Sequence, residues 1–485
     1  MFVWLFVLPL LVAVPLHLSV LAIHLSNTPS LGPDQFTPIA IFAAALIIVY
    51  GSLRALRYRG TFSFPAVALA LCGIGLVTQY RIGTISSMQI TSASQLALPL
   101  GIVIMLGTYW LGRYGRISRL EPFWLVFLAL SVIVIIFVLV AGRKYRGAVY
   151  LPGNINPAEI IKPLLIIFIA SMLSGHRLLL RRSFLGIPLP PLNILVTVGA
   201  LWAPPMLLLI AQGDMGMFAL MNATLIVMLY AVTNRSAYLL GGLAGIFTLA
   251  HLLIPLSSRG RARLAAWLNP FDAATSTGWQ PLQALVALYT GGFWGTGFGG
   301  GSPGVVPIVE SDFAYIIIGE ELGLIGCACI VLLFCTLIVS GMRVAERTDN
   351  HYRATVATGI IACLGLQTLL NIGGVVKAIP LTGIPLPFIS HGGSSLVTTL
   401  LMPGIILAIS DDRPPAKTKK RGSLKAREKT GCKEKTGGRS KKGCTQKKGS
   451  MRCLTSFKHQ SQPQISAKRR VVSTKSFHDT SAGIP

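Results

Sequence analysis

Twelve apolar stretches, each roughly 20 residues long, decide what this chain can fold into. A helix of roughly 20 apolar residues crosses about 30 Å of hydrocarbon. Inside lipid, a single segment satisfies its backbone hydrogen bonds only as a helix. Hydrophobic residues make up 52% of the 485 positions and charged residues only 12%, which excludes an ordinary soluble domain. The predicted spans are 1–24, 37–56, 62–80, 93–112, 122–141, 158–175, 188–210, 215–232, 236–256, 313–340, 354–373 and 393–410.

The fold class expected from these spans is an all-α, polytopic helical bundle. The first stretch lacks the basic start and the small-residue cleavage site of a secretory signal, so we interpret it as a retained helix. A large polar loop, residues 257–311, separates the ninth span from the tenth. Its apolar middle, Leu282–Leu288, predicts a short helix lying along the membrane surface.

The formal net charge of +27 is concentrated after the last span. From Asp411 to the end there are 21 Lys/Arg and five Asp/Glu, which accounts for +16 of the total. Such a tail has too few large apolar residues to fold alone, and we expect residues 411–485 to be disordered. Its cysteines, Cys432, Cys444 and Cys453, do not have the spacing of a zinc module. We expect no nucleic-acid binding, because Phe457 and Phe477 are the only aromatic residues of the tail that could stack on bases.

Deleting residues 414–485 should leave the function of the membrane part intact and weaken association with anionic membrane lipid. Each cation near an anionic surface contributes about 1 kcal/mol, and the effect fades within about 8 Å. The residues closest to the last span should therefore matter most, namely Lys417, Lys419, Lys420 and Arg421. The test is binding of the isolated tail peptide to anionic and neutral vesicles at two salt concentrations. Equal binding to both vesicle types would contradict the prediction.

The distribution of cations between loops predicts that both termini face the cytoplasm. With that orientation, inward loops hold thirteen Lys/Arg and outward loops eight, in agreement with the positive-inside rule. Seven of the outward cations fall in three loops that also carry unusual Pro and Gly motifs. They are Arg143, Lys144, Arg146, Arg259, Arg261, Arg263 and Lys377. A phosphate or pyrophosphate on a lipid carrier would explain this outer cluster, since guanidinium groups bind such oxygens bidentately; pairing with lipid headgroups is the alternative.

Carboxylates at the mouths of two spans are the candidate reactive groups. Asp312 stands where the long polar loop re-enters an apolar helix, so its carboxylate meets partial desolvation and nearby cations, which tune a pKa. Glu159 and Lys162 lie three residues apart and share a helix face, either as functional groups or as a structural ion pair. Asp214 is explained by N-capping alone.

Five groups of motifs in the family's order make the chain resemble the SEDS family (shape, elongation, division and sporulation), which includes FtsW and RodA. They are RGAVYLPGNINPAEIIKP (146–163), QGDMG (212–216), RLAAWLNP with GWQPLQ (263–270 and 278–283), VPIVESDF with GEELG (306–313 and 319–323), and NIGGVVKAIPLTGIPLPFISHGGSS (371–395). The resemblance covers about residues 62–410. It implies a ten-helix glycosyltransferase core, so residues 1–61 would be two additional N-terminal helices.

The resemblance implies a peptidoglycan glycosyltransferase that polymerises lipid II at the outer face of the bacterial cytoplasmic membrane, with a class B penicillin-binding protein as partner. The family's essential aspartate corresponds to Asp312, which would accept the proton of the acceptor hydroxyl. The expected substrate-binding residues are Arg263, Lys162, Glu159, Gln280, Gln283, Lys377 and Ser394. No cofactor or metal site is predicted; assistance by a divalent cation, Mg²⁺ or Mn²⁺, stays open. A lipid II flippase and a non-catalytic scaffold of cell-wall synthesis are the alternative functions.

Overall fold

The computed structural model describes residues 7–18, 36–85, 90–145, 148–150, 158–180, 192–256, 258–272, 277–307, 309–390 and 393–411. The tail beyond residue 411 lies outside the described residues. So does His391, in the last of the motifs.

A helix occupies each of the twelve predicted spans, which confirms the helical membrane fold. Seven of the described helices are long and apolar enough to cross a membrane, and five shorter apolar helices fall on the other spans. The helices are residues 7–18, α2 (Thr37–Ala55), α3 (Ser63–Ile85), α4 (Ile90–Gly112), α5 (Trp124–Ala141), α6 (Ala158–Leu180), α7 (Leu192–Gln212), α8 (Met215–Thr233), α9 (Ser236–Leu256), α12 (Ala314–Glu346), α13 (His351–Val375) and α14 (Gly393–Ser410).

Short elements fill the connections between these helices. The predicted surface helix at 282–288 lies inside the longer α11 (Trp279–Gly291), while α10 (Ser258–Leu268) was not predicted. Two 3-10 helices, η2 (Arg116–Phe123) and η3 (Pro303–Val305), are the remaining helical elements of the described ranges. The strands β1 (Arg143–Tyr145) and β2 (Ala148–Tyr150) form an antiparallel pair in which Lys144 faces Val149. This hairpin is the one departure from an all-helical chain among the described residues.

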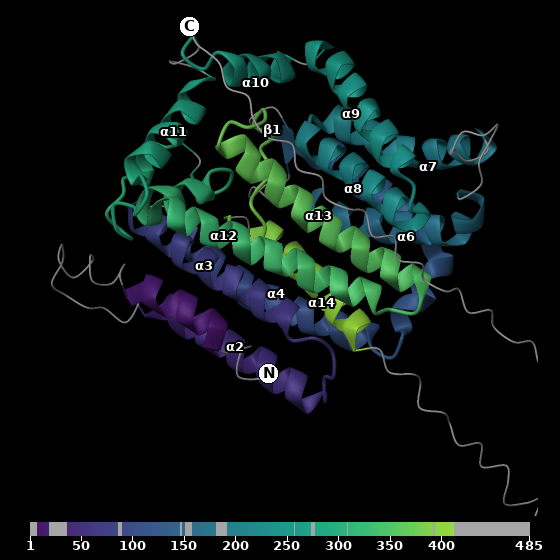
Figure 1. Cartoon of the computed structure of the whole chain (residues 1–485), viewed down its shortest axis with the longest axis horizontal. Coiled ribbons are helices and arrows are strands. Elements are labelled where there is room, and N and C mark those ends of the chain that lie inside the picture. Colours follow the sequence, from purple (N-terminus) through teal and green to yellow (C-terminus); the bar gives the residue numbers. More distant parts are fainter. Residues whose placement is uncertain are drawn as a thin grey trace, which may run out of the picture. The chain divides into compact units, whose positions relative to one another are not determined.

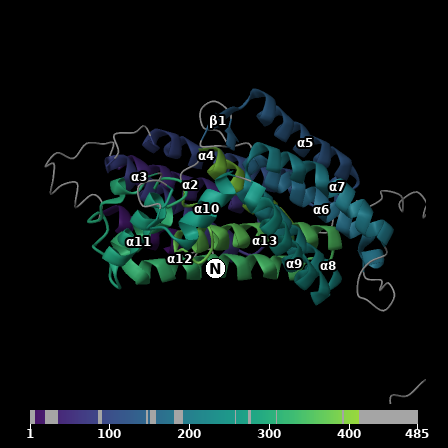
Figure 2. The ribbon, with the colours of Figure 1, turned by 90° about the horizontal axis from the view of Figure 1, so that it is seen from above.

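The helix α3 is the most deeply buried of the seven long apolar helices. The core around it is built by α12 against α3 and α13, and by α14 against α4 (Figure 1). Residues 63–83 of α3 are 94% buried, whereas only 17% of the most apolar stretch of residues 116–141 is buried. Figure 2 shows α5, in that second region, at the outer edge of the bundle beside α7. A polar side chain on α3 therefore meets protein, while the apolar face of α5 suits lipid.

The helix α12 is broken near its start, at Gly323. The glycine-rich loop that follows α11, residues 292–301, packs into this break. At Gly323 the backbone is left-handed, with φ 65° and ψ −162°. The amides of Thr296 and Gly297 donate to the carbonyls of Glu320 and Glu321, both at 3.0 Å. On the other side of the break, the Leu324 amide donates to the Gly292 carbonyl at 3.0 Å. The loop thus supplies the hydrogen bonds that the broken helix loses.

Candidate active site

Asp312 lies one residue before the N-cap of α12, in the irregular segment that ends the long polar loop. Its side chain is half-buried, and Ser311 Oγ donates to Asp312 Oδ1 at 3.0 Å. The neighbouring Gly383 has a φ of 73°, a conformation that favours glycine. A Cβ atom at Gly383 would lie 3.6 Å from Asp312 Oδ2 and 2.8 Å from Arg263 Nη2. The carboxylate and the guanidinium group therefore flank the same point of the backbone.

Arg263 reaches this point from α10. Its Nη1 donates to the Thr382 carbonyl at 2.7 Å, and its side chain is half-buried. The neighbouring Trp267 ties α10 to the same region, since its Nε1 donates to the Lys377 carbonyl at 3.0 Å. Arg263 thus has a structural contact that the sequence did not suggest, and still brings a cation to Asp312.

Glu159 and Lys162 form an ion pair at the start of α6, and each is only 1% exposed. Lys162 Nζ also donates to Gln367 Oε1 at 2.8 Å, and Gln367 Nε2 donates to the Pro385 carbonyl at 2.8 Å. The pair is therefore connected through Gln367 to the segment that follows Gly383.

Asp214 links the two groups electrostatically. As the N-cap of α8 it accepts a hydrogen bond from the Met217 amide at 2.9 Å, which confirms the capping role. Burial raises the pKa of the Asp214 carboxyl, against the lowering effect of the Met217 bond; the Glu159 charge raises it further, and the Arg263 and Lys162 charges lower it. Asp214 therefore lies within electrostatic range of Glu159, Lys162 and Arg263. The described region gathers three carboxylates and two cations.

The other expected substrate-binding residues take different places. Gln280 is half-buried on α11, and its Nε2 donates to the Pro307 carbonyl at 2.8 Å. Gln283 is half-buried on the same helix. Lys377 follows α13 with a left-handed φ of 60° and a half-buried side chain. Ser394 lies in the first turn of α14, and its side chain is outside the described residues.

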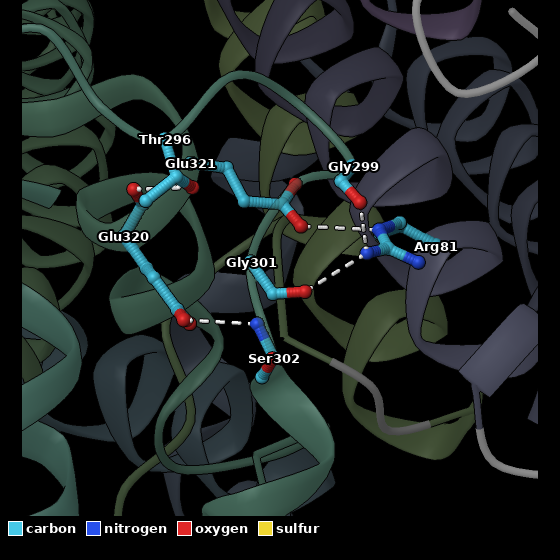
Figure 3. A network of polar contacts seen from close by, with 7 residues as sticks. All are labelled: Arg81, Thr296, Gly299, Gly301, Ser302, Glu320 and Glu321. Carbon is cyan, nitrogen blue, oxygen red and sulfur yellow. Dashed lines mark hydrogen bonds and ion pairs between the residues drawn. The ribbon is translucent and has the colours of Figure 1, made fainter. Parts of the chain in front are cut away.

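A second polar network joins α3 to the glycine-rich loop and to the break in α12 (Figure 3). Arg81 Nε donates to Glu321 Oε1 at 3.0 Å, and Arg81 Nη2 donates to the carbonyls of Gly299 and Gly301. Glu320 accepts a hydrogen bond from the Ser302 amide at 2.9 Å. The two glutamates thus hold the glycine-rich loop against the break in α12.

Three buried amides at the site, Gln79, Gln367 and Asn371, were missed by the sequence analysis. The signal was present, because all three are polar residues inside predicted spans, where such groups are costly unless bonded. For a metal, no three His, Cys, Asp or Glu side chains come together within the described ranges.

Comparisons with known proteins give one consistent family. The sequence model FTSW_RODA_SPOVE, described as "Cell cycle protein", matches residues 62–414. The peptidoglycan glycosyltransferase RodA of Mycobacterium tuberculosis H37Rv is 32% identical over 417 residues, covering 80% of this chain and 87% of the relative. The probable peptidoglycan glycosyltransferase FtsW of Geobacter metallireducens is 33% identical over 287 residues, covering 58% of this chain and 74% of the relative.

Two solved structures share the fold. One comes from work on structural coordination of polymerization and crosslinking by a peptidoglycan synthase complex, with a TM-score of 0.59 and 23% identity. The other is the rod shape determining protein RodA of Thermus thermophilus, with a TM-score of 0.53 and 22% identity. Each match covers 73% of this chain and 98% of the other. At this identity they support the fold alone.

Proposed function

We propose that this chain, a member of the FTSW_RODA_SPOVE family of cell cycle proteins, polymerises lipid II with Asp312 as the catalytic base. It is a peptidoglycan glycosyltransferase, the activity for which its RodA and FtsW relatives are named. The observation that carries this assignment is the placement of the Asp312 carboxylate and the Arg263 guanidinium around Gly383. A base and a cation at one point suit a reaction in which a hydroxyl loses a proton and an anion leaves.

The proposed reaction joins two lipid-linked sugars. The C4 hydroxyl oxygen of an acceptor lipid II attacks the anomeric carbon of the donor chain, and the bond from that carbon to the pyrophosphate oxygen breaks. Asp312 accepts the hydroxyl proton, and the leaving pyrophosphate takes the bonding electrons. A positioned base of this kind typically contributes about 10²–10⁴-fold.

The two cations have different parts in this proposal. Arg263 is half-buried and is therefore the better placed to contact the leaving pyrophosphate. Lys162 is buried and bonded to Glu159 and Gln367, which favours support of the site through its charge over direct contact. Whether Mg²⁺ or Mn²⁺ assists is tested by adding a chelator to the polymerisation assay.

We place the site on the outer face of the bacterial cytoplasmic membrane, with both termini inside. Twelve alternating spans put the end of α3, the start of α12, the end of α13 and the start of α14 on one side. That side carries Asp312 and Arg263, and the excess of loop cations falls on the other. Residues 62–410 would form the catalytic core and 1–61 an addition to it.

The partner we propose is a class B penicillin-binding protein, which would crosslink the strands that this chain makes. The fold shared with a structure from work on a peptidoglycan synthase complex supports this choice. The decisive experiment is co-purification with a candidate partner, followed by lipid II polymerisation with products resolved by length. A scaffold would yield no polymer in any combination. A flippase would yield none either, and would move labelled lipid II across vesicle membranes.

Arg263→Glu should raise the KM for lipid II by about tenfold or more, because hydrogen bonds to charged groups contribute about 1.5–3 kcal/mol. Arg347→Glu, at an exposed arginine directly after α12 and among the inward loop cations, is the matched control. The measurement is initial rate against lipid II concentration for both variants, together with thermal stability in detergent. An unchanged KM in Arg263→Glu, or an equal rise in the Arg347 control, would argue against a pyrophosphate contact.

A further inference from the structure

We propose that Gln79 and Asn371 are positioning residues that hold the Asp312 backbone in place by joining two irregular segments. We call residues 309–313 the aspartate segment and residues 384–390 the proline segment. Neither is helical, so several of their backbone carbonyls find partners outside the segment. This inference rests on the proposed role of Asp312.

Asn371, near the end of α13, binds both segments with one nitrogen. Its Nδ2 donates to the Asp312 carbonyl at 2.9 Å and to the Ile384 carbonyl at 2.8 Å. The side chain is 2% exposed. A primary amide nitrogen carries two hydrogens, and Asn371 donates one to each segment.

Gln79, on α3, makes the same kind of connection from another helix. Its Nε2 donates to the Glu310 carbonyl at 3.1 Å and to the Ile389 carbonyl at 3.0 Å, and the side chain is 3% exposed. Asn371 therefore donates to the aspartate segment at residue 312, and Gln79 donates to it two residues earlier. In the proline segment, Asn371 donates to residue 384 and Gln79 to residue 389.

The orientation of both amides follows from their partners. All four acceptors are carbonyl oxygens, so the nitrogen and not the oxygen of each amide must face them. The remaining oxygens, Gln79 Oε1 and Asn371 Oδ1, are buried and have no hydrogen-bond partner within the described part of the chain. An unsatisfied buried acceptor is costly, so side chains kept here for packing alone would be apolar. An apolar residue could not donate two hydrogen bonds from one atom, as these amides do.

The consequence for catalysis is geometric. The hydrogen bond from Asn371 fixes the peptide that joins Asp312 to Phe313, and the bond from Gln79 fixes the carbonyl of Glu310. Together they restrict the position of the Asp312 backbone, from which the carboxylate extends. Gly383, which directly precedes the proline segment, lies beside both this carboxylate and Arg263. A displacement of about 1 Å of a reacting group can reduce a rate by about 10²-fold.

The test compares Gln79→Leu, Asn371→Leu and the double variant with Asn222→Leu. Asn222 is a half-buried amide of α8 that bonds its own helix at Phe218 as well as Trp202 and Met206 of α7, and none of these bonds reaches either segment. We expect each single variant to lower kcat by roughly tenfold to 100-fold, with the KM for lipid II within about twofold of the native value. We also expect the double variant to lose less than the product of the two single losses, because both amides hold the same segments.

Hydrogen exchange supplies a readout that does not depend on activity. Peptides covering residues 309–313 and 384–390 should exchange faster in both single variants and unchanged in Asn222→Leu. If a leucine variant does not accumulate in the membrane, Asn371→Ser, which keeps one donor, takes its place.

Three results would each overturn the positioning role. They are faster exchange with native kcat, a change in KM alone, and a loss of kcat in the double variant equal to the product of the two single losses. The proposed function fails separately, through full activity of Asp312→Asn, and that result would leave the exchange prediction standing.

Discussion

Asp312→Asn should reduce glycan polymerisation by roughly 10²–10⁴-fold, the contribution expected of a positioned general base. The substitution keeps the shape of the side chain and can still accept the hydrogen bond from Ser311 Oγ, but an amide does not take a proton from a hydroxyl. The measurement is the initial rate of polymer formation from lipid II by the purified protein with its partner. Membrane insertion and thermal stability should stay at native levels.

The matched control is Glu310→Gln, which neutralises a half-buried carboxylate two residues away in the same segment. It should keep most of the activity, because the contact found at this residue uses its main-chain carbonyl. Asp312→Glu keeps the charge but moves it, and should fall between the two. Equal losses in Glu310→Gln and Asp312→Asn would point to local charge and remove Asp312 from the reacting centre.

The membrane spans could be predicted because each one is a long apolar run of the sequence. Long apolar runs leave a helix as the only way to satisfy the backbone in lipid. The helix α10 escaped prediction because Arg259, Arg261 and Arg263 give it the composition of a solvated loop. The break at Gly323 escaped as well, since its hydrogen bonds come from Gly292 to Gly297, which no local pattern of α12 indicates.

The residues of the candidate site could also be predicted only in part. Asp312 and the Glu159–Lys162 pair were predicted from their positions at the mouths of spans, Arg263 from the cluster of outward cations, and all of them also from the family resemblance. The convergence of Asp312 and Arg263 was not predictable from spacing, since the two side chains meet at Gly383, a residue from a third part of the chain. The amides Gln79 and Asn371 carry no charge, and only the fold shows that their donors meet four carbonyls.

Arg81→Met should destabilise the protein by about 3–5 kcal/mol, the usual result of removing one partner from a buried ion pair. Glu321 is fully buried and would lose its cation, and the carbonyls of Gly299 and Gly301 would lose a shared donor. We expect limited proteolysis to cut the loop between residues 293 and 301 sooner than in the native protein. Arg261→Met, at an exposed arginine, is the control and should change neither stability nor cleavage.

The double variant Arg81→Met/Glu321→Met distinguishes two roles of Arg81, neutralising the Glu321 charge and holding the glycine-rich loop. Replacing both members of a buried pair by apolar residues often restores stability, since no uncompensated charge is left. Here we expect only partial recovery, because Arg81 also donates to the two glycine carbonyls and methionine cannot. Stability in detergent should therefore rank native, double variant and Arg81→Met in descending order, with loop cleavage fast in both variants. Full recovery with native cleavage would mean that the loop is held by its backbone bonds to the α12 break, and that Arg81 only neutralises Glu321.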